Sequence, residues 1–313
     1  MQNFPAEARG FGLSYPGFVK NAKPTSVGKV PALNFYIPQY SQRTRMATRL
    51  LVFAICAALT ALAAATTREP GVVHAQRRPA PKFHVIALAE PNSIHRPFVD
   101  AAKGWLGRES MTENFAIDYI ANTEPIDDAF LAQYQLFIQL DYPPYGWTQK
   151  AQDAFIKYIE EGKGGWIGFH HAALLGEFDG YPMWDWFSKF MGGIRYKDYI
   201  ATFVTATVKV EDPKHPVMKG LPATFEIERE EWYTWNKSPR PNVRVLASVD
   251  ENSYSPDTKI KMGDHPVIWT NEHYKARNIY IFMGHHADLF ENPAFTTIFK
   301  NAIFWAAQQK PTQ

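Results

Sequence analysis

Between residues 83 and 169, short apolar runs alternate with segments of helical spacing, and this alternation restricts the fold more than any other feature. The apolar runs predict strands at 83–89, 116–120, 134–140 and 166–169. The intervening segments predict helices at 95–106, 126–133 and 148–161. Thr148 is a good start signal for the last helix and Gly162 a good stop signal. Strands that alternate with helices form a parallel sheet with right-handed crossovers, so we predict an α/β fold with a flavodoxin-like or Rossmann-like sheet flanked by helices.

The second half of the chain has a different pattern. Residues 200–210 alternate β-branched side chains with other residues, which is typical of an antiparallel strand. Further strands are predicted at 224–235, 243–248, 266–270 and 278–283. An amphipathic helix is predicted at 293–308. The simplest arrangement is one domain, residues 83–308, in which a β-rich insertion interrupts the parallel sheet.

The segment before this domain has the pattern of a targeting signal. An apolar run at 50–65 follows Arg43, Arg45 and Arg49, and it is too short to span a membrane comfortably. We predict a signal peptide over residues 46–75, a linker at 76–82, and a non-native or disordered extension at 1–45. The protein is then periplasmic or secreted and leaves the membrane once the signal is cleaved. An uncleaved N-terminal anchor is the alternative.

Composition excludes several classes of function. The formal net charge is only +2, and no basic patch stands out in the sequence. Both features argue against nucleic acid as a partner. The only cysteine, Cys56, lies inside the predicted signal peptide, so the mature protein has no cysteine nucleophile. No Gly-x-Gly-x-x-Gly turn follows the first strand, and no P-loop, Gly-x-Ser-x-Gly or His-Glu-x-x-His motif occurs. No organic cofactor is therefore indicated.

Polar side chains follow four of the predicted strands. In an open parallel sheet, ligands bind beyond the carboxyl ends of the strands, so these side chains are candidates for a site. They are Glu90 and His95 after the first strand, Asp141 and Tyr145 after the third, His170 and His171 after the fourth, and His285 and His286 after the strand at 278–283. Ordinary polar surface loops are the alternative interpretation.

His170 occupies a distinctive position. Gly168 precedes it by two residues and Ala172 follows it by two, which is the steric pattern of a nucleophile elbow. A histidine at the apex can act as base, acid, metal ligand or hydrogen-bond donor, or can simply close the turn. The histidine pairs, with Glu90 or Asp141, also leave a divalent metal possible. Adjacent strand residues point to opposite faces, so we expect one histidine of each pair to face the site.

A carboxylate cluster at 228–231 precedes two aromatic residues, Trp232 and Tyr233. Glu231 beside a histidine would suit general acid–base chemistry, and the aromatic rings would suit stacking on a sugar. A solvated acidic edge strand explains the same carboxylates equally well.

Several motifs, in order, resemble those of the trehalose-utilisation (ThuA-like) family. The resemblance rests on Gly164–Ala172, Trp184, Phe187, Gly192-Gly193, His215-Pro216, Gly220-Leu221-Pro222, Phe225, Glu230–Tyr233, Pro266–Trp269, Gly284–His286 and Ile303–Ala306. It implies a fold similar to class I glutamine amidotransferases, without their catalytic triad, and a role in the metabolism of trehalose-type disaccharides or their keto derivatives. His170, Glu231 and His285 are the motif positions that it marks.

These observations support three hypotheses. The first is an exported carbohydrate-active enzyme without a cysteine or serine nucleophile, in which His170, His285 and Glu231 are catalytic. Its substrate contacts would come from Glu90, Asp141, Tyr145, His171, Trp232, Tyr233 and His286. The second is a non-catalytic carbohydrate-binding module, and the third a metal-dependent hydrolase.

Overall fold

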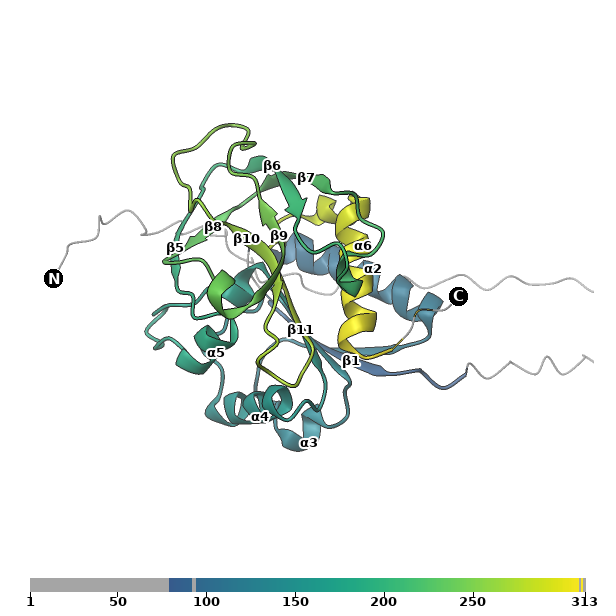
Figure 1. The fold of residues 1–313 in the computed structure, drawn as a ribbon. Helices are drawn as coiled ribbons and strands as arrows, with labels where there is room; N and C mark the ends of the chain where they lie inside the picture. Colours follow the sequence, from purple (N-terminus) through teal and green to yellow (C-terminus); the bar gives the residue numbers. More distant parts are fainter. Residues whose placement is uncertain (1–78, 92–93, 310, 312–313) are drawn as a thin grey trace, which may run out of the picture. The chain divides into compact units, whose positions relative to one another are not determined.

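The computed structural model describes residues 79–91, 94–309 and 311 (Figure 1). All of these fall in one compact unit of the chain, residues 77–313. The predicted extension, the predicted signal peptide and the first part of the predicted linker lie outside the described residues. No helix in the described ranges is both long and apolar enough to cross a membrane.

The first half of this unit alternates strands and helices as predicted. In chain order the elements are β1 (His84–Ala89), α2 (Arg96–Glu113), β2 (Ala116–Ile120), α3 (Asp128–Leu131), β3 (Leu136–Leu140), α4 (Gln149–Glu160) and β4 (Gly165–Phe169). β3 and β4 are buried along their whole length, as expected for strands covered on both faces. The Thr148 side chain accepts a hydrogen bond from the Ala151 amide and caps α4.

The second half is richer in strands. Its helices and turns are η1 (His170–Ala173), α5 (Asp185–Phe190), η2 (Pro216–Met218), η3 (Arg240–Asn242), η4 (Ala287–Glu291) and α6 (Pro293–Ala306). Its strands are β5 (Tyr196–Tyr199), β6 (Val204–Val210), β7 (Thr224–Glu230), β8 (Tyr233–Trp235), β9 (Arg244–Val249), β10 (Pro266–Thr270) and β11 (Asn278–Ile281). The predicted strand at 224–235 is thus two strands, because the chain leaves the main sheet after Glu230.

Nine strands form one mixed sheet in the order β2-β1-β3-β4-β11-β10-β9-β6-β7. The first five are parallel to one another, and the pairs from β11 to β7 are antiparallel. β5 and β8 form a separate antiparallel pair. The prediction of a parallel α/β sheet with a β-rich insertion is confirmed. The insertion falls between β4 and β11, and most of its strands extend the same sheet.

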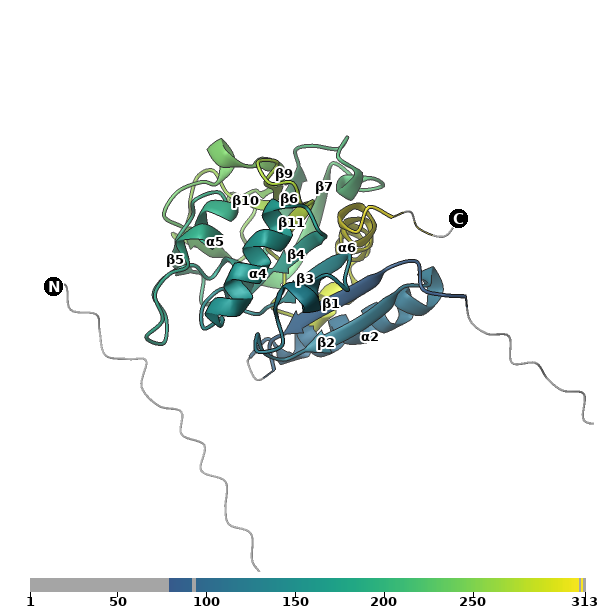
Figure 2. The same ribbon diagram turned by 90° about the horizontal axis from the view of Figure 1, so that it is seen from below.

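Helices cover both faces of the parallel half. α2 and α6 lie together on one face, where Trp105 stacks on Phe299 with ring centroids 4.8 Å apart (Figure 1). α4 and α5 lie on the opposite face, where Phe155 stacks on Phe187 at 6.0 Å (Figure 2). The two helical layers bury β1, β3 and β4, so we expect ligands to bind beyond the ends of these strands.

Candidate functional site

The carboxyl ends of the parallel strands meet at one edge of the sheet, and the predicted polar residues gather there. Glu90 and His95 follow β1, Asp141 follows β3, His170 begins η1 directly after β4, and His285 lies just beyond β11. Glu231 reaches the same place from the end of β7 in the antiparallel half. Segments nearly 200 residues apart in the sequence therefore supply one site.

Three imidazoles and one carboxylate form its centre, which we call the histidine cluster: His95, His170, Glu231 and His285. His95 Nε2 lies 2.8 Å from His285 Nδ1. Glu231 Oε2 lies 3.3 Å from His170 Nε2 and 3.4 Å from His285 Nδ1. The three histidine side chains are at most 6% exposed and Glu231 is 11% exposed. The cluster therefore holds its polar atoms away from bulk water.

The turn from β4 into η1 places His170. Its φ of 36° lies in the left-handed region, which a residue other than glycine adopts only under constraint. Small neighbours make the turn possible. A Cβ on Gly168 would come within 2.1 Å of the Trp166 ring, and a Cβ on Gly284 within 2.6 Å of the His170 Cβ. The elbow geometry that the sequence pattern indicates is present, with an imidazole at its apex.

A β-bulge places Glu231. Burial alternates along β7 up to Arg229, where φ is 49° and the pairing with β6 slips by one residue. Before the bulge, Glu226 and Glu228 face solvent. After it, Glu230 and Glu231 are both buried, and Glu230 accepts hydrogen bonds from the Glu231 and Gly284 amides. Of the three carboxylates in the predicted cluster at 228–231, Glu228 therefore lies on a solvated strand, and Glu230 and Glu231 belong to the site.

A more open group adjoins the histidine cluster. His171 Nδ1 lies 3.3 Å from Glu90 Oε2, and its ring centroid is 4.0 Å from that of His95. His171 and Glu90 are 15% and 16% exposed, more than any member of the cluster. Burial, followed by the charges of Asp179 and Glu90, raises the pKa of Tyr145 to about 12, and the Tyr145 ring stacks on the exposed Tyr181 at 6.3 Å. This side of the site faces the solvent.

Burial sets the charge states of the site. It lowers the pKa of His95 to about 4 and the pKa of His170 well below its ordinary value, so both imidazoles are neutral near pH 7. Burial raises the pKa of Glu230 to about 7. Burial would also raise the pKa of Glu231, but hydrogen bonds with His170 and His285 outweigh it and lower that pKa. Two adjacent carboxyl groups therefore differ widely in proton affinity.

Asp141 lies beneath the cluster. Its carboxyl is fully buried, neither oxygen has a hydrogen-bond partner among the described residues, and burial raises its pKa well above the ordinary value. A Cβ on Gly284 would meet Asp141 Oδ1 at 2.8 Å and the His170 Cβ at 2.6 Å, so Asp141 and His170 flank the same glycine. The structure places Asp141 against the cluster but away from solvent.

Three other predicted residues lie outside the cluster. The Trp232 ring is completely buried, stacks on Phe282 at 5.3 Å and donates to the Val204 carbonyl, so it offers no open face to a sugar. Tyr233 is also buried, with its ring 4.4 Å from that of His170. The His286 ring lies 4.7 Å from that of His285 and 4.5 Å from the exposed Phe203, but it is not among the converging donor residues.

His95 is the member of the cluster that the sequence analysis listed at a strand end but gave no role in the site. It stands at the N-cap of α2, after a loop, where strand alternation gives no direction for its side chain. Phe203, which is 43% exposed and 4.9 Å from the His285 ring, has no signal in the sequence. The position of His95 directly after the first strand was the one clue available.

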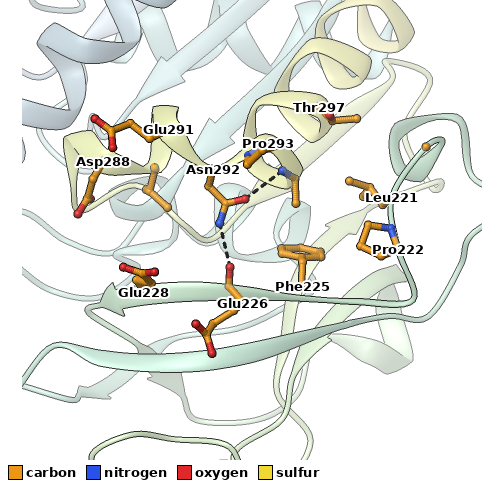
Figure 3. A pocket seen from close by; sticks show the side chains of 13 residues that line it. Leu221, Pro222, Phe225, Glu226, Glu228, Asp288, Glu291, Asn292, Pro293 and Thr297 are labelled. Atoms are coloured by element: carbon orange, nitrogen blue, oxygen red, sulfur yellow. Dashed lines mark hydrogen bonds between the residues drawn. The ribbon is translucent and has the colours of Figure 1, made fainter.

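A separate cavity of about 690 Å³ lies between β7 and the segment from η4 into α6 (Figure 3). Glu226, Glu228, Asp288 and Glu291 give it an acidic lining, and Asn292 bridges its walls by donating to the Glu226 carbonyl. None of the predicted site residues lines it. Its lining includes no histidine.

Fold and site together define an amidotransferase-like α/β protein in which a histidine replaces the nucleophile at the elbow. The model of the ThuA family, described as trehalose utilisation, matches residues 84–306. The chain therefore belongs to the ThuA family, as the sequence motifs indicate.

Solved structures support this assignment. A protein described as ThuA-like from Bacteroides uniformis is 31% identical, with a TM-score of 0.66 over 74% of this chain and 94% of that one. A second, from Parabacteroides merdae, is 19% identical, with a TM-score of 0.51 over 74% of this chain and 92% of that one, and shows the same fold. No curated protein matches the sequence.

Proposed function

We propose that this protein is an exported enzyme that acts on a trehalose-type disaccharide or its keto derivative at the edge of the sheet. The observation that carries the proposal is the convergence of three buried imidazoles with Glu231 beside the more open His171–Glu90 pair. The family's description as trehalose utilisation supports the sugar class. Export is supported by the N-terminal sequence pattern alone, and the mass of the mature protein tests it.

The site offers groups for proton transfer at the sugar. His171 is exposed enough to touch a ligand, and Glu90 lies close enough to orient its ring. The adjacent carboxyl groups of Glu230 and Glu231, whose pKa values differ widely, are typical of sites that combine acid and base chemistry. We assign proton transfer to His171, with His170, His285 and Glu231 polarising the substrate.

Aromatic rings flank this group on two sides. Tyr145 and Tyr181 form a stacked pair next to Glu90, and Phe203 lies against His285 and His286. Partly exposed rings of this kind suit the apolar face of a sugar ring. We propose Tyr145 and Phe203 as the stacking residues, in place of the buried Trp232.

A non-catalytic sugar-binding module is the alternative function, favoured by the absence of a nucleophile at the elbow. The burial and altered proton affinities of the site oppose it, because hydrogen bonding to a neutral sugar needs neither. Neutral, buried imidazoles beside carboxylates are costly to build and are typical of catalytic sites.

NMR spectroscopy of a panel of disaccharides and keto-disaccharides, incubated with the purified protein, tests the proposal. We expect turnover of at least one sugar, its loss in His171→Ala and His170→Ala, and its retention in His273→Ala, which changes an exposed histidine in the turn before β11, at the opposite end of that strand from His285. Line broadening without turnover would establish the binding module instead. No response to any sugar from the folded protein would refute both functions.

A further inference from the structure

The donor atoms of the histidine cluster are arranged like the ligands of a metal ion. His95 Nε2, His170 Nε2, His285 Nδ1 and Glu231 Oε2 all lie within 4.8 Å of one another, and three of their separations are 2.8, 3.3 and 3.4 Å. Ligand bonds of about 2.0–2.1 Å in a tetrahedral site place neighbouring donor atoms about 3.3–3.4 Å apart. We propose that these four residues bind one divalent transition-metal ion.

Counting donors and acceptors gives an independent argument. A neutral imidazole has one N–H. The two nitrogens of His170 both face acceptors, the Phe282 carbonyl at 3.2 Å and Glu231 Oε2 at 3.3 Å. If Nδ1 donates to the carbonyl, the lone pair of Nε2 points at a carboxylate oxygen. That contact is repulsive unless a cation lies between the two atoms.

The same conflict recurs around the cluster. His95 Nδ1 faces Glu90 Oε2 at 3.6 Å, which favours the proton on that nitrogen and leaves the lone pair of Nε2 toward His285. His285 Nδ1 then faces both this lone pair and Glu231 Oε2 with one proton at most. If His285 carries its proton on Nε2, four lone pairs converge on one small volume, and a single divalent cation satisfies all of them.

The surroundings are those of an outer ligand shell. Histidine ligands in proteins usually donate their second nitrogen to a carboxylate or a backbone carbonyl, which fixes the ring and its tautomer. His95 has Glu90 in this position and His170 has the Phe282 carbonyl. Glu230 lies directly next to Glu231 and anchors the Gly284 amide, which precedes His285. Two of the three imidazoles are thus already oriented for coordination.

The donor set selects the class of metal. Three imidazoles and one carboxylate suit Zn²⁺, Co²⁺, Fe²⁺ or Mn²⁺, whereas Mg²⁺ and Ca²⁺ prefer all-oxygen sites. Glu90, His95 and His171 form a second possible group, but it has one ligand fewer and is more exposed. We therefore assign Glu90, which faces His95 Nδ1, to the outer shell and place His171 outside it. The ion would polarise a sugar carbonyl or hydroxyl oxygen, so this inference deepens the proposed function and relies on the same site.

Metal binding can be measured without a substrate. The full chain, stripped with a chelator and shown to be metal-free by elemental analysis, would be titrated with Zn²⁺, Co²⁺ and Mg²⁺ in a calorimeter. We expect one equivalent of Zn²⁺ or Co²⁺ to bind and Mg²⁺ not to compete. The visible spectrum of bound Co²⁺ would report imidazole coordination and the number of ligands.

Matched variants test the ligand set. His95→Ala and His285→Ala should weaken Zn²⁺ binding by at least about 100-fold, and Glu90→Gln, in the outer shell, by about 10- to 100-fold. His171→Ala and His286→Ala should bind one equivalent as the parent does. Circular dichroism of each metal-free variant controls for folding.

Two outcomes would overturn the proposal: no binding of Zn²⁺ or Co²⁺ by the folded parent protein, or loss of binding in His171→Ala with retention in His285→Ala. Metal binding without turnover of any sugar would leave this inference intact and refute the proposed enzyme. Turnover by a protein that binds neither Zn²⁺ nor Co²⁺ would do the reverse.

Discussion

Five histidines are buried among the residues that the structure describes, and they fall into two groups with opposite surroundings. His265 and His215 lie in the strand-rich half, and each has a hydrogen-bond partner that complements its ring nitrogen. His265 Nδ1 lies 2.9 Å from the Glu251 carboxylate, and His215 Nδ1 accepts a hydrogen bond from the Val217 amide. In the histidine cluster, by contrast, nitrogens face nitrogens and carboxylate oxygens that compete for too few protons.

This comparison shows that burial alone does not identify a functional histidine. Each of the two structural histidines has a complementary bond that favours the folded chain. His95, His170 and His285 instead have mismatched neighbours, which cost stability and are retained where a ligand resolves the mismatch. Substitution of the carboxylate in the histidine cluster should therefore reduce turnover, whereas substitution of the carboxylate beside His265 should reduce stability.

Glu231→Gln should have the largest effect of the substitutions, and this effect should be a loss of turnover. The neutral amide removes a metal ligand and the partner of His170 and His285, so we expect turnover to fall at least about 100-fold. The amide N–H can donate to His170 Nε2, so the free energy of unfolding of the metal-free protein should change by less than about 1 kcal/mol. Progress curves on the active sugar and urea unfolding measure the two effects.

Glu228→Gln is the matched control for this prediction. Glu228 lies on the same strand, before the bulge at Arg229, and faces solvent and the acidic cavity. We expect no change in turnover. An equal loss of turnover in both variants would place the reaction in the acidic cavity and not in the histidine cluster.

The sequence predicted the sheet well because the signal for a buried strand is local. β2 and β10 have the predicted bounds, and β1, β3, β4 and β11 differ from prediction by one or two residues. β6 begins four residues later than predicted. The short elements α5 and β5 were not predicted, because contacts with segments distant in the sequence hold them: Phe187 of α5 packs on Phe155, and Tyr196 of β5 packs on Tyr233.

The candidate site also has residues that local sequence patterns predict and residues that they do not. His170 and His285 follow strands, so the edge on which they lie was predictable. The inward direction of Glu231 depends on the bulge at Arg229, which is set by pairing between β6 and β7. The burial of Trp232 depends on contact with Phe282, fifty residues further along the chain. Such long-range contacts leave no periodic pattern in the sequence.

Glu251→Gln should have an intermediate effect, and this effect should be a lower free energy of unfolding. The carboxylate of Glu251 accepts hydrogen bonds from the Met262 and Gly263 amides and pairs with His265. An amide has one oxygen in place of two, so at least one buried N–H would lose its acceptor. We expect a loss of about 2 kcal/mol in the free energy of unfolding, with turnover per folded molecule unchanged.

Urea unfolding followed by tryptophan fluorescence, together with turnover corrected for the folded fraction, checks this result. A stable Glu251→Gln variant with impaired turnover would contradict the division of the histidines into two groups. It would show that the pair of His265 and Glu251 contributes to the reaction.

His215→Asn should have the smallest effect, which appears only at acidic pH. Burial lowers the pKa of His215 to about 4, so between about pH 6.5 and 4 the unfolded chain takes up a proton that the folded chain does not. His215 therefore contributes stability that is fully present above pH 6.5 and is lost as the pH falls toward 4. Asparagine is a good N-cap residue, so its side chain can still accept the hydrogen bond from the Val217 amide. Unlike histidine, it does not titrate.

We expect the free energy of unfolding to fall between pH 7 and pH 5 by about 1 to 2 kcal/mol less in His215→Asn than in the parent. Urea titrations of both proteins at the two pH values measure this difference. The ring of His215 also packs on Trp305 at 4.7 Å, so the variant should be less stable at pH 7, and only the change with pH is diagnostic. An identical pH dependence in both proteins would show that His215 keeps its ordinary proton affinity, and that its burial does not exclude the charged form.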